Sequence, residues 1–530
     1  MPRRARLAAV VLVAALVSGA CSSGTDGSGA DAAGAPSRVD GAVFGADDLP
    51  PLHLEGGEHP RIADADGRQV LLRGVNLNTL ADYDRPVPGL EPTFPHDDGE
   101  FAEMAALGFD VVRLLVSWSR LEPEPGRIDD EYVADVRAAV DAAAAEGLYT
   151  VVDMHQDAFS KHVATPADVA CPAGLQRAVG WDGAPAWATL TDGRSTCNNG
   201  SRETSGAVVA AWTNFWADTD GVQGHLVEVW ARLAGEFADE PAVAGYDLLN
   251  EPGIGPGVDA TNEALARFHR RALEAIRSAE DDAGGFPHLV FFEPVILWSG
   301  LGVAPVPPPF SDDANLVFAP HLYAESITAG DVTIAGGFDH AARVAAEHDT
   351  TFWVGEYGWF GDPDEQAGLV AEYGRQEDRH LVGGAWWQWR QACGDPHSIG
   401  GRPGEAPPDV LVHLHRTACP SGEDLGLTQP WATTLSRTYP RSAPGRLTRL
   451  RNDAASGAAR IRGEVDGDGT LVLWVPDRGL GAPLVSAADG ALGEVVAGDG
   501  GYRVEVPVRG AYEVRVTPAD ALAVGGATEG

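Results

Sequence analysis

Short apolar runs rich in β-branched residues alternate along most of the chain with longer stretches of helical periodicity. Between residues 130 and 146, for example, valines and alanines recur every three or four positions, and residues 207–237 show a similar helical pattern. Strands that alternate with helices of this length are typical of repeated βα units, whose strands form a parallel sheet. The pattern therefore predicts an α/β fold for the central part of the chain.

After about residue 440 the pattern changes to short alternating strands separated by glycine and aspartate, as in residues 470–476. This pattern is typical of a small antiparallel β-sandwich, which we place at residues 441–520. Such a domain can bind carbohydrate or merely cover another domain. We favour the structural role because no row of aromatic residues is available, the candidates being only Trp474, Tyr502 and Tyr512.

The first twenty residues have the pattern of an export signal: three arginines, an apolar run from Leu7 to Val17, and then small residues up to Ala20. The run is too short to span a bilayer as a mature helix. Cys21 and the residues after it resemble a bacterial lipoprotein attachment site, although Ser18 stands where that motif usually has leucine. We expect an exported protein, either anchored to the membrane through lipid on Cys21 or secreted after cleavage behind Ala20.

Residues 21–45 consist mainly of glycine, alanine, serine and aspartate, a composition that predicts a disordered tether. The whole chain of 530 residues carries 38 basic and 77 acidic residues, which gives a formal charge of −39. Such a charge repels phosphate backbones, so we do not expect nucleic acid as a partner. The number of subunits is not indicated by the sequence.

Four cysteines remain when Cys21 is set aside, an even number in a chain predicted to be exported. Disulfides persist in such compartments. Pairing of neighbours, Cys171 with Cys197 and Cys393 with Cys419, is the simplest of three connectivities. Zinc binding is the alternative, but no two cysteines have the short spacing of a zinc site.

Two glutamates stand out because each ends an apolar run: Glu251 within residues 246–252 and Glu356 within residues 352–358. Paired carboxylates at strand ends are the groups that glycoside hydrolysis with retention requires. In a chain with 77 acidic residues some glutamate will follow a strand by chance. The setting favours function, since Asn250 supplies an amide for a sugar hydroxyl and aromatic residues surround Glu356.

These motifs resemble glycoside hydrolase family 5, a family of retaining enzymes on the TIM barrel, and within it the endoglycoceramidases. The resemblance extends over residues 60–390 and implies a (β/α)8 barrel, which we place at residues 46–440. The motifs that carry it are Leu72-Arg73-Gly74-Val75-Asn76, Val112-Arg113-Leu114, Asp153-Met154-His155-Gln156-Asp157, Asn250-Glu251-Pro252, Pro320-His321-Leu322-Tyr323 and Gly355-Glu356-Tyr357-Gly358.

Given the barrel that the resemblance implies, eight apolar runs can be assigned as its strands: residues 70–75, 111–116, 150–153, 244–249, 288–292, 316–320, 351–355 and 383–387. Glu251 then follows strand four and Glu356 follows strand seven, where the family carries its acid/base and its nucleophile. Two connections, residues 158–206 and 390–430, are far longer than usual and contain the two cysteine pairs. We expect them to wall the substrate cleft.

The resemblance also implies roles for other residues. Arg113 resembles the arginine that keeps the nucleophile ionised, and Asn250 the residue that binds the sugar 2-hydroxyl. Of the three tryptophans around strand eight, Trp386, Trp387 and Trp389, we expect Trp389 to stack on a sugar, because it lies furthest toward the catalytic end. The remaining predicted substrate-binding residues are therefore His155, Asp157, His321, Tyr323 and Trp389. No motif calls for a metal or an organic cofactor.

The resemblance implies cleavage of the β-glycosidic bond between glycan and ceramide, with a glycolipid or oligosaccharide as substrate. The alternatives are a β-glycanase or β-glucosidase acting on unlipidated glycans and, from another class, a non-catalytic carbohydrate-binding lipoprotein. Both glutamates with their supporting residues argue against the last. The apolar residues 296–310 could line an acyl groove or be packed down by their prolines, and the sequence leaves both open.

Overall fold

The computed structural model describes residues 36–95 and 97–519. The predicted export signal, Cys21 and most of the predicted tether lie outside these residues. Within them, no helix combines the length and apolar character needed to cross a membrane.

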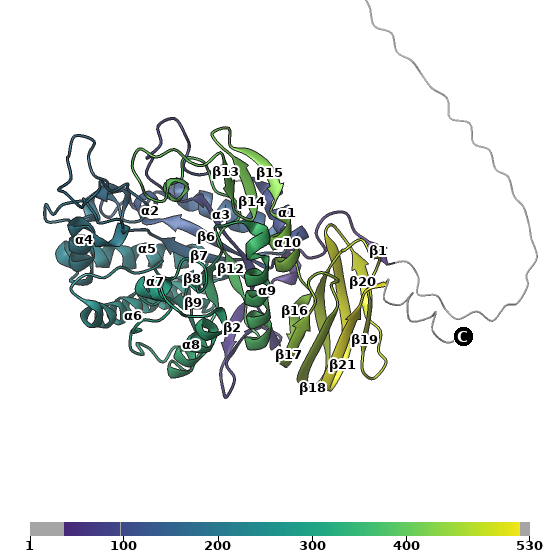
Figure 1. The fold of residues 1–530 in the computed structure, drawn as a ribbon. Coiled ribbons are helices and arrows are strands. Elements are labelled where there is room, and N and C mark those ends of the chain that lie inside the picture. The colour runs from purple at the N-terminus through teal and green to yellow at the C-terminus, as the bar shows by residue number, and fades with distance from the viewer. Residues whose placement is uncertain (1–35, 96, 520–530) are drawn as a thin grey trace, which may run out of the picture. The chain divides into compact units, whose positions relative to one another are not determined.

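Eight parallel strands form the central sheet, in the order β10-β9-β8-β7-β6-β5-β12-β11 (Figure 1). The sheet closes on itself, because the Phe318 N–H donates to the Thr351 carbonyl (3.1 Å) and Trp353 N–H donates to Phe318 (2.9 Å). The predicted (β/α)8 barrel is confirmed. Its strands are β5 (Arg73–Leu80), β6 (Val111–Ser117), β7 (Tyr149–His155), β8 (Val243–Asp247), β9 (Leu289–Phe292), β10 (Leu316–Phe318), β11 (Val354–Tyr357) and β12 (Gly384–Trp386).

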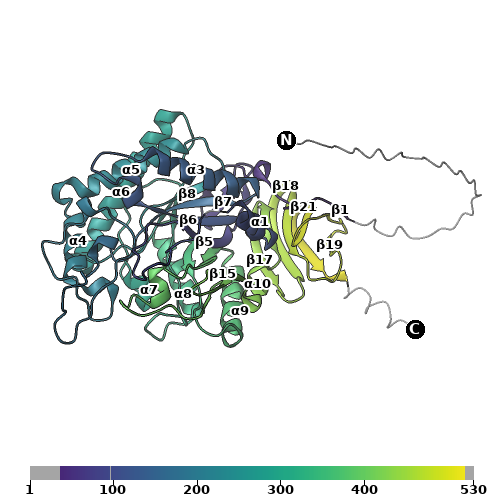
Figure 2. The ribbon, with the colours of Figure 1, turned by 90° about the horizontal axis from the view of Figure 1, so that it is seen from above.

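Helices lie around this sheet (Figure 2). They are α1 (Asp98–Ala106), α2 (Trp118–Leu121), α3 (Asp130–Ala145), α4 (Gly206–Trp216), α5 (Val222–Glu236), α6 (Val258–Ala283), α7 (Leu297–Leu301), α8 (Ile334–Glu347), α9 (Pro363–His380) and α10 (Gln429–Leu435). The helix predicted at 130–146 is α3, whose first turn is capped by the Asp129 carboxylate. The segment 207–237 instead forms two helices, because the backbone is left-handed at Asp218, Asp220 and Gly221.

A second sheet is built on one long antiparallel pair of strands, β18 (Ala459–Pro476) and β21 (Gly501–Thr517). The register shifts between Glu464 and Asp468, and apolar residues from both sides of this shift share one core. The flanking strands are β1 (Ser37–Arg38), β2 (Leu52–Glu55), β3 (Arg61–Asp64), β4 (Arg68–Gln69), β16 (Tyr439–Pro444), β17 (Arg446–Asn452), β19 (Leu484–Ala487) and β20 (Glu494–Ala497). The predicted C-terminal antiparallel sheet is present.

One feature of this sheet was not predicted. Residues 36–45 belong to it rather than to a tether, since β1 pairs with β20 and Val43 and Phe44 are buried in its core. The sheet also contacts the barrel, because the Tyr439 hydroxyl donates to the Gly108 carbonyl (2.7 Å). Trp474, Tyr502 and Tyr512 are all buried, which agrees with a structural role.

The two long connections follow β7 and β12, and both predicted disulfides, Cys171–Cys197 and Cys393–Cys419, are present. The connection after β12 also forms a small antiparallel sheet of its own. Its strands are β13 (Val410–Val412), β14 (His415–Ala418) and β15 (Glu423–Leu427). Each disulfide therefore limits the freedom of a connection that has few regular elements.

Candidate active site

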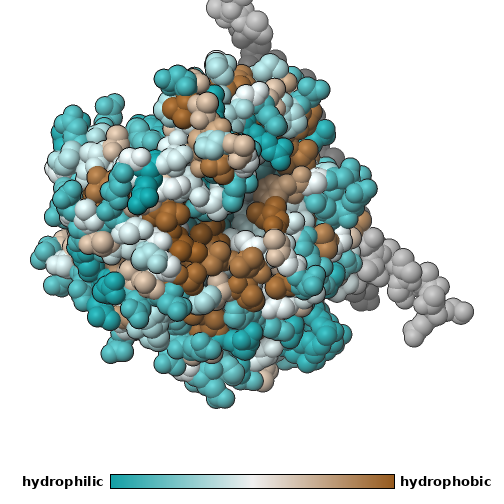
Figure 3. Space-filling model, turned by 60° about the vertical axis from the view of Figure 1, so that its left-hand side comes forward, coloured by the Kyte–Doolittle hydropathy of each residue, from teal (hydrophilic) through white to brown (hydrophobic). Residues whose placement is uncertain are grey.

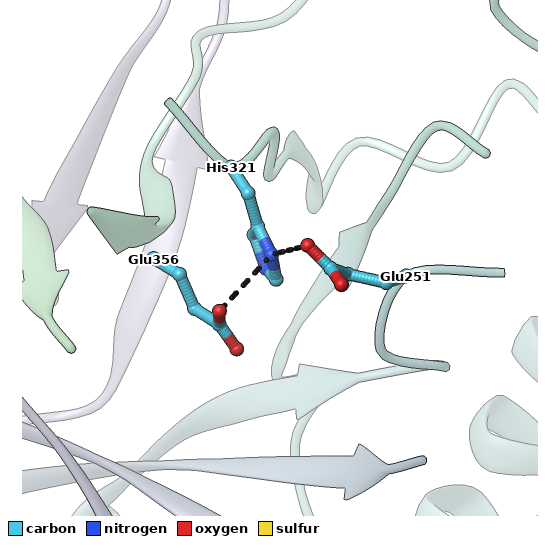
Figure 4. Close-up of side chains that lie close together, drawn as sticks. All are labelled: Glu251, His321 and Glu356. Carbon is cyan, nitrogen blue, oxygen red and sulfur yellow. Dashed lines mark hydrogen bonds and ion pairs between the residues drawn. The ribbon is translucent and has the colours of Figure 1, made fainter. Parts of the chain in front are cut away.

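Glu251 and Glu356 reach the same place from two strands of the barrel. Glu251 lies four residues beyond β8 and Glu356 lies within β11, both at the carboxyl ends of parallel strands. His321, which follows β10, points between them (Figure 4), with Nδ1 3.0 Å from Glu251 Oε1 and 3.4 Å from Glu356 Oε2. Oxygens of the two carboxylates lie within 4.8 Å of each other. The two predicted catalytic residues therefore form a close pair.

The backbone at Glu251 is held in an unusual conformation. Its φ angle is 39°, a left-handed value that costs free energy in a residue other than glycine. The Glu251 N–H donates to Glu293 Oε2 (2.8 Å), and Gln156 Nε2 donates to the carbonyl of Glu251 (2.9 Å). These two side chains hold the turn that aims the Glu251 carboxylate at its partner.

Arg113 is completely buried beneath the pair, in contact with four carboxylates. Its guanidinium nitrogens lie 2.9 to 3.0 Å from oxygens of Asp153, Asp247, Glu293 and Glu356. Burial disfavours a charged guanidinium, but these carboxylates raise the pKa of Arg113 well above its usual value. Burial and the charge of Glu293 raise the pKa of Asp247 in turn. Arg113 is thus an internal cation shared by the acidic groups of the site.

Asn250 and Tyr323 complete the polar groups next to the pair. Asn250 accepts from Arg113 (3.0 Å), and its Nδ2 donates one hydrogen to the Gln156 carbonyl (2.9 Å). The amide has a second hydrogen and lines the cavity, where it can meet a ligand hydroxyl. The Tyr323 hydroxyl donates to Glu356 Oε2 (2.9 Å). Both residues lie where the resemblance places them.

His155 and Asp157 form the next part of the wall. His155 Nδ1 lies 2.7 Å from Asp153 Oδ2, and its ring stacks on Trp387 with 5.6 Å between centroids. Burial would lower the pKa of His155, but Asp153 and Asp157 raise it to about 10, so the ring is charged at neutral pH. Asp157 is also in contact with His397 (3.3 Å). Its pKa is well below its usual value, because its cationic neighbours outweigh burial.

The prediction of Trp389 as a sugar-stacking residue is wrong. Trp389 is buried against His415, whereas Trp387 lines the cavity. The prediction extended strand alternation beyond its limit: β12 ends at Trp386, so the direction of later side chains does not follow the pleat. Trp387 takes the place that the sequence analysis gave to Trp389.

The pKa values of the two glutamates are set by different neighbours. Burial would raise the pKa of Glu251, but the hydrogen bond and charge of His321, together with Arg202, lower it. Burial raises the pKa of Glu356, and the charges of His321 and Arg113 offset this only in part. The two carboxyls interact and titrate as a pair.

A cavity of about 680 Å³ opens above these groups. Apolar side chains contribute a large part of its wall, and two of them, Ile327 and Phe360, are 59% and 43% exposed. Figure 3 shows a face on which apolar side chains gather around a hollow. The lining residues include Ile296, Ser299, Ile327, Phe360, Val410, Leu411 and Val412. The cavity therefore joins a charged base to an apolar rim.

The two alternatives for residues 296–310 each hold for part of the segment. Ile296, Ser299 and Gly300, at and within α7, line the cavity. Phe310 instead lies in the barrel core, where its ring meets Phe292 edge-on. The first part of the segment is therefore available to a ligand, and the last part is packed in the barrel core.

Four polar residues of the site were not predicted: Arg202, Gln391 and His397, which line the cavity, and Glu293, which contacts Arg113 and His321. Arg202 and His397 come from the two long connections, where no periodicity shows which side chains turn inward. Glu293 could have been predicted, because it directly follows β9. Other site residues were predicted from the same position, directly after a barrel strand.

Comparison with known proteins agrees with this site. Residues 63–392 match the family model described as cellulase (glycosyl hydrolase family 5). Endoglycoceramidase I of Rhodococcus hoagii (strain 103S) is 30% identical over 495 residues, which cover 82% of this chain and 91% of the relative. The chain belongs to glycosyl hydrolase family 5 and is a glycoside hydrolase.

Two solved structures give finer comparisons. A crystal structure of endogalactoceramidase is 48% identical, with a TM-score of 0.81, and the alignment covers 89% of this chain and 100% of that one. The lactosyl-enzyme intermediate of endo-glycoceramidase II from Rhodococcus sp. is 26% identical, with a TM-score of 0.65 and coverages of 87% and 99%. The fold is thus shared nearly from end to end with both.

Proposed function

We propose that the chain hydrolyses β-glycosides with retention, using Glu356 as nucleophile and Glu251 as acid/base. The observation that carries this proposal is the spacing of the two carboxylates, whose oxygens lie within 4.8 Å. Retaining enzymes have their carboxyl groups about 5 to 5.5 Å apart, whereas inverting enzymes leave about 6.5 to 9.5 Å for a water molecule. The covalent intermediate of the related endo-glycoceramidase II supports the same route.

In the first step Glu356 attacks the anomeric carbon while Glu251 gives its proton to the departing oxygen. Arg113 and the Tyr323 hydroxyl both contact Glu356 and stabilise it as an anion before attack. Asn250 offers its free amide hydrogen to the sugar 2-hydroxyl, a contact that strengthens as positive charge develops on the ring. The aglycone then leaves with the proton of Glu251.

In the second step Glu251 is ionised and removes a proton from water, which attacks the glycosyl ester on Glu356. Once Glu356 is esterified it carries no charge, so the pair no longer contains two competing anions. His321 lies against both carboxylates in each step, and Glu293 lies 3.1 Å from its other ring nitrogen. A charged His321 therefore offsets whichever glutamate is ionised.

We propose that the substrate is a glycosphingolipid, cut between glycan and ceramide. The endoglycoceramidase and endogalactoceramidase relatives support this, as does a cavity with a charged base and an apolar rim. Chromatography after incubation with glucosylceramide, galactosylceramide, gangliosides and cellulose-type glycans tests it. We expect intact ceramide and intact glycan. Cleavage of unlipidated glycans alone would support a β-glycanase or β-glucosidase instead.

The exposed apolar rim leads to a prediction on lipid substrates. Changing both Ile327 and Phe360 to serine is expected to lower kcat/KM on glycosylceramides at least about tenfold, since burying each side chain contributes about 1.5 to 3 kcal/mol. A phenyl glycoside, which has no acyl chains, should lose little. Leu492→Ser is a matched control, because Leu492 is 61% exposed but does not line the cavity. Equal losses on both substrates would contradict a lipid-binding rim.

We also propose that the protein is exported and held at the cell surface through lipid on Cys21. The support is the sequence pattern before and after that residue. Mass spectrometry of the mature protein is expected to give a lipid-modified Cys21 as its first residue. An unmodified Cys21 would mean a freely secreted enzyme, and the barrel chemistry would be unaffected.

A further inference from the structure

Arg202 reaches the acid/base from the connection that follows β7. It is the first residue of a short 3-10 helix, Arg202–Thr204, and its side chain is 24% exposed at the edge of the cavity. One nitrogen, Nη2, lies 3.1 Å from Glu251 Oε2 and 2.5 Å from Asp157 Oδ1. The guanidinium is stacked over Trp181, with 4.7 Å to the ring centroid. A loop residue is thus held in direct contact with the group that must donate the proton.

The surroundings of Glu251 show what this contact adds. The cations that contact its carboxylate are His321 on one oxygen and Arg202 on the other. The acidic groups facing it are Asp157, Glu203, Glu293 and Glu356, and Tyr323 is uncharged. His321 also serves Glu293 and Glu356, so it is not dedicated to Glu251. Of the two cations, Arg202 alone approaches from outside the barrel strands and their ends.

The two halves of the reaction need opposite states of Glu251. Glycosylation requires the protonated acid, and hydrolysis of the intermediate requires the ionised base. A guanidinium at hydrogen-bond distance stabilises the ionised state. The guanidinium therefore opposes glycosylation at alkaline pH, where Glu251 must stay protonated. It favours hydrolysis of the intermediate at acidic pH, where Glu251 must be ionised.

We propose that Arg202 is a positioning residue for Glu251, which stabilises the ionised form of this carboxylate and so sets the pH range over which it acts as acid and as base. This inference rests on the proposed roles of Glu251 and Glu356 but not on ceramide as substrate. Arg202 also contacts Asp157 at 2.5 Å, but Asp157 has two further cationic partners, His155 and His397. Besides Arg202, the cation in contact with the Glu251 carboxylate is His321, so we expect the titration of Glu251 to respond to loss of Arg202.

The test is the pH dependence of Arg202→Gln on two aryl glycosides. A phenyl glycoside needs a proton on its leaving group, and kcat/KM reports the acid in the free enzyme. Without Arg202 the pKa of Glu251 rises, so the alkaline limb of kcat/KM should move to higher pH by about one unit. A dinitrophenyl glycoside needs no such proton, and its alkaline limb should stay in place. For that substrate kcat reports hydrolysis of the intermediate, and its acidic limb should move upward.

Two further variants separate this role from simple support of the loop. Arg202→Lys retains the charge and should keep both limbs near their positions in the unmodified enzyme. Arg194→Gln removes an exposed arginine of the same connection and should change neither limb. An equal loss of activity at every pH on both substrates, or unmoved limbs, would overturn the inference. If Glu251 and Glu356 variants failed to show the roles proposed for them, the chemistry itself would be wrong, whatever Arg202 does.

Discussion

Replacing Glu356 with glutamine is expected to abolish turnover and covalent trapping by an activated fluorosugar. The amide has nearly the same shape but cannot attack the anomeric carbon, and loss of a nucleophile costs at least about a thousandfold in kcat. Mass spectrometry of the trapped enzyme should place the sugar on Glu356. Glu228→Gln on the exposed face of α5 is a matched control and should leave turnover unchanged.

Glu251→Ala should behave differently, because it removes the proton donor and not the nucleophile. The variant is expected to form the intermediate from dinitrophenyl glycosides, whose leaving group needs no proton, and then to hydrolyse it slowly. Added azide should restore turnover and give a β-glycosyl azide, since a small anion can occupy the space of the lost carboxylate. Trapping on any residue other than Glu356, or an inverted azide product, would contradict the assignment.

Arg113→Gln is expected to have the second largest effect, on both stability and activity. The change leaves Asp153, Asp247, Glu293 and Glu356 without their shared cation, and breaking a buried ion pair in this way costs about 3 to 5 kcal/mol in the free energy of unfolding. Urea denaturation measures this cost. Burial already raises the pKa of Glu356, and loss of Arg113 raises it further, so the nucleophile should be protonated at higher pH. The acidic limb of kcat/KM should therefore move upward.

Arg73→Gln distinguishes the two effects. Arg73 forms a buried ion pair with Asp378 (2.7 Å), and neither residue lines the catalytic cavity. This control should also lower stability, but the acidic limb of kcat/KM should stay in place. An Arg113 variant that lost stability with no movement of the limb would show that Arg113 supports the fold without acting on Glu356.

Much of the fold prediction came from local periodicity in the sequence. Apolar runs of strand length predicted a parallel α/β fold, and the family motifs completed the barrel. All eight strands begin within three residues of the predicted start, and the largest shifts are at β5, which begins at Arg73 instead of Val70, and at β11, which begins at Val354 instead of Thr351. The shift at β5 has a cause outside the barrel: Arg68–Gln69 pairs as β4 with β3 and β16, and the Val70 N–H donates to Ile62.

The residues around the catalytic pair show the limit of such reasoning. Residues of the family motifs, such as Arg113, Asn250 and His321, could be assigned to the site through the resemblance, although Arg113 lies within β6 and not at its end. The choice between Trp387 and Trp389 failed because it depended on backbone directions beyond the end of β12. A pattern of period two has no meaning once the chain leaves the pleated strand.

The sequence by itself determined the barrel, the two glutamates at its strand ends and the cysteine pairs, because each depends on local periodicity, on a short motif or on simple pairing of neighbours. Only the tertiary structure decided which side chains of the long connections enter the site. Arg202 and His397 lie 45 and 240 residues from Asp157 in the chain, yet both contact its carboxylate. Their positions follow from how irregular, disulfide-linked segments pack over the barrel, and this packing has no periodic signal in the sequence.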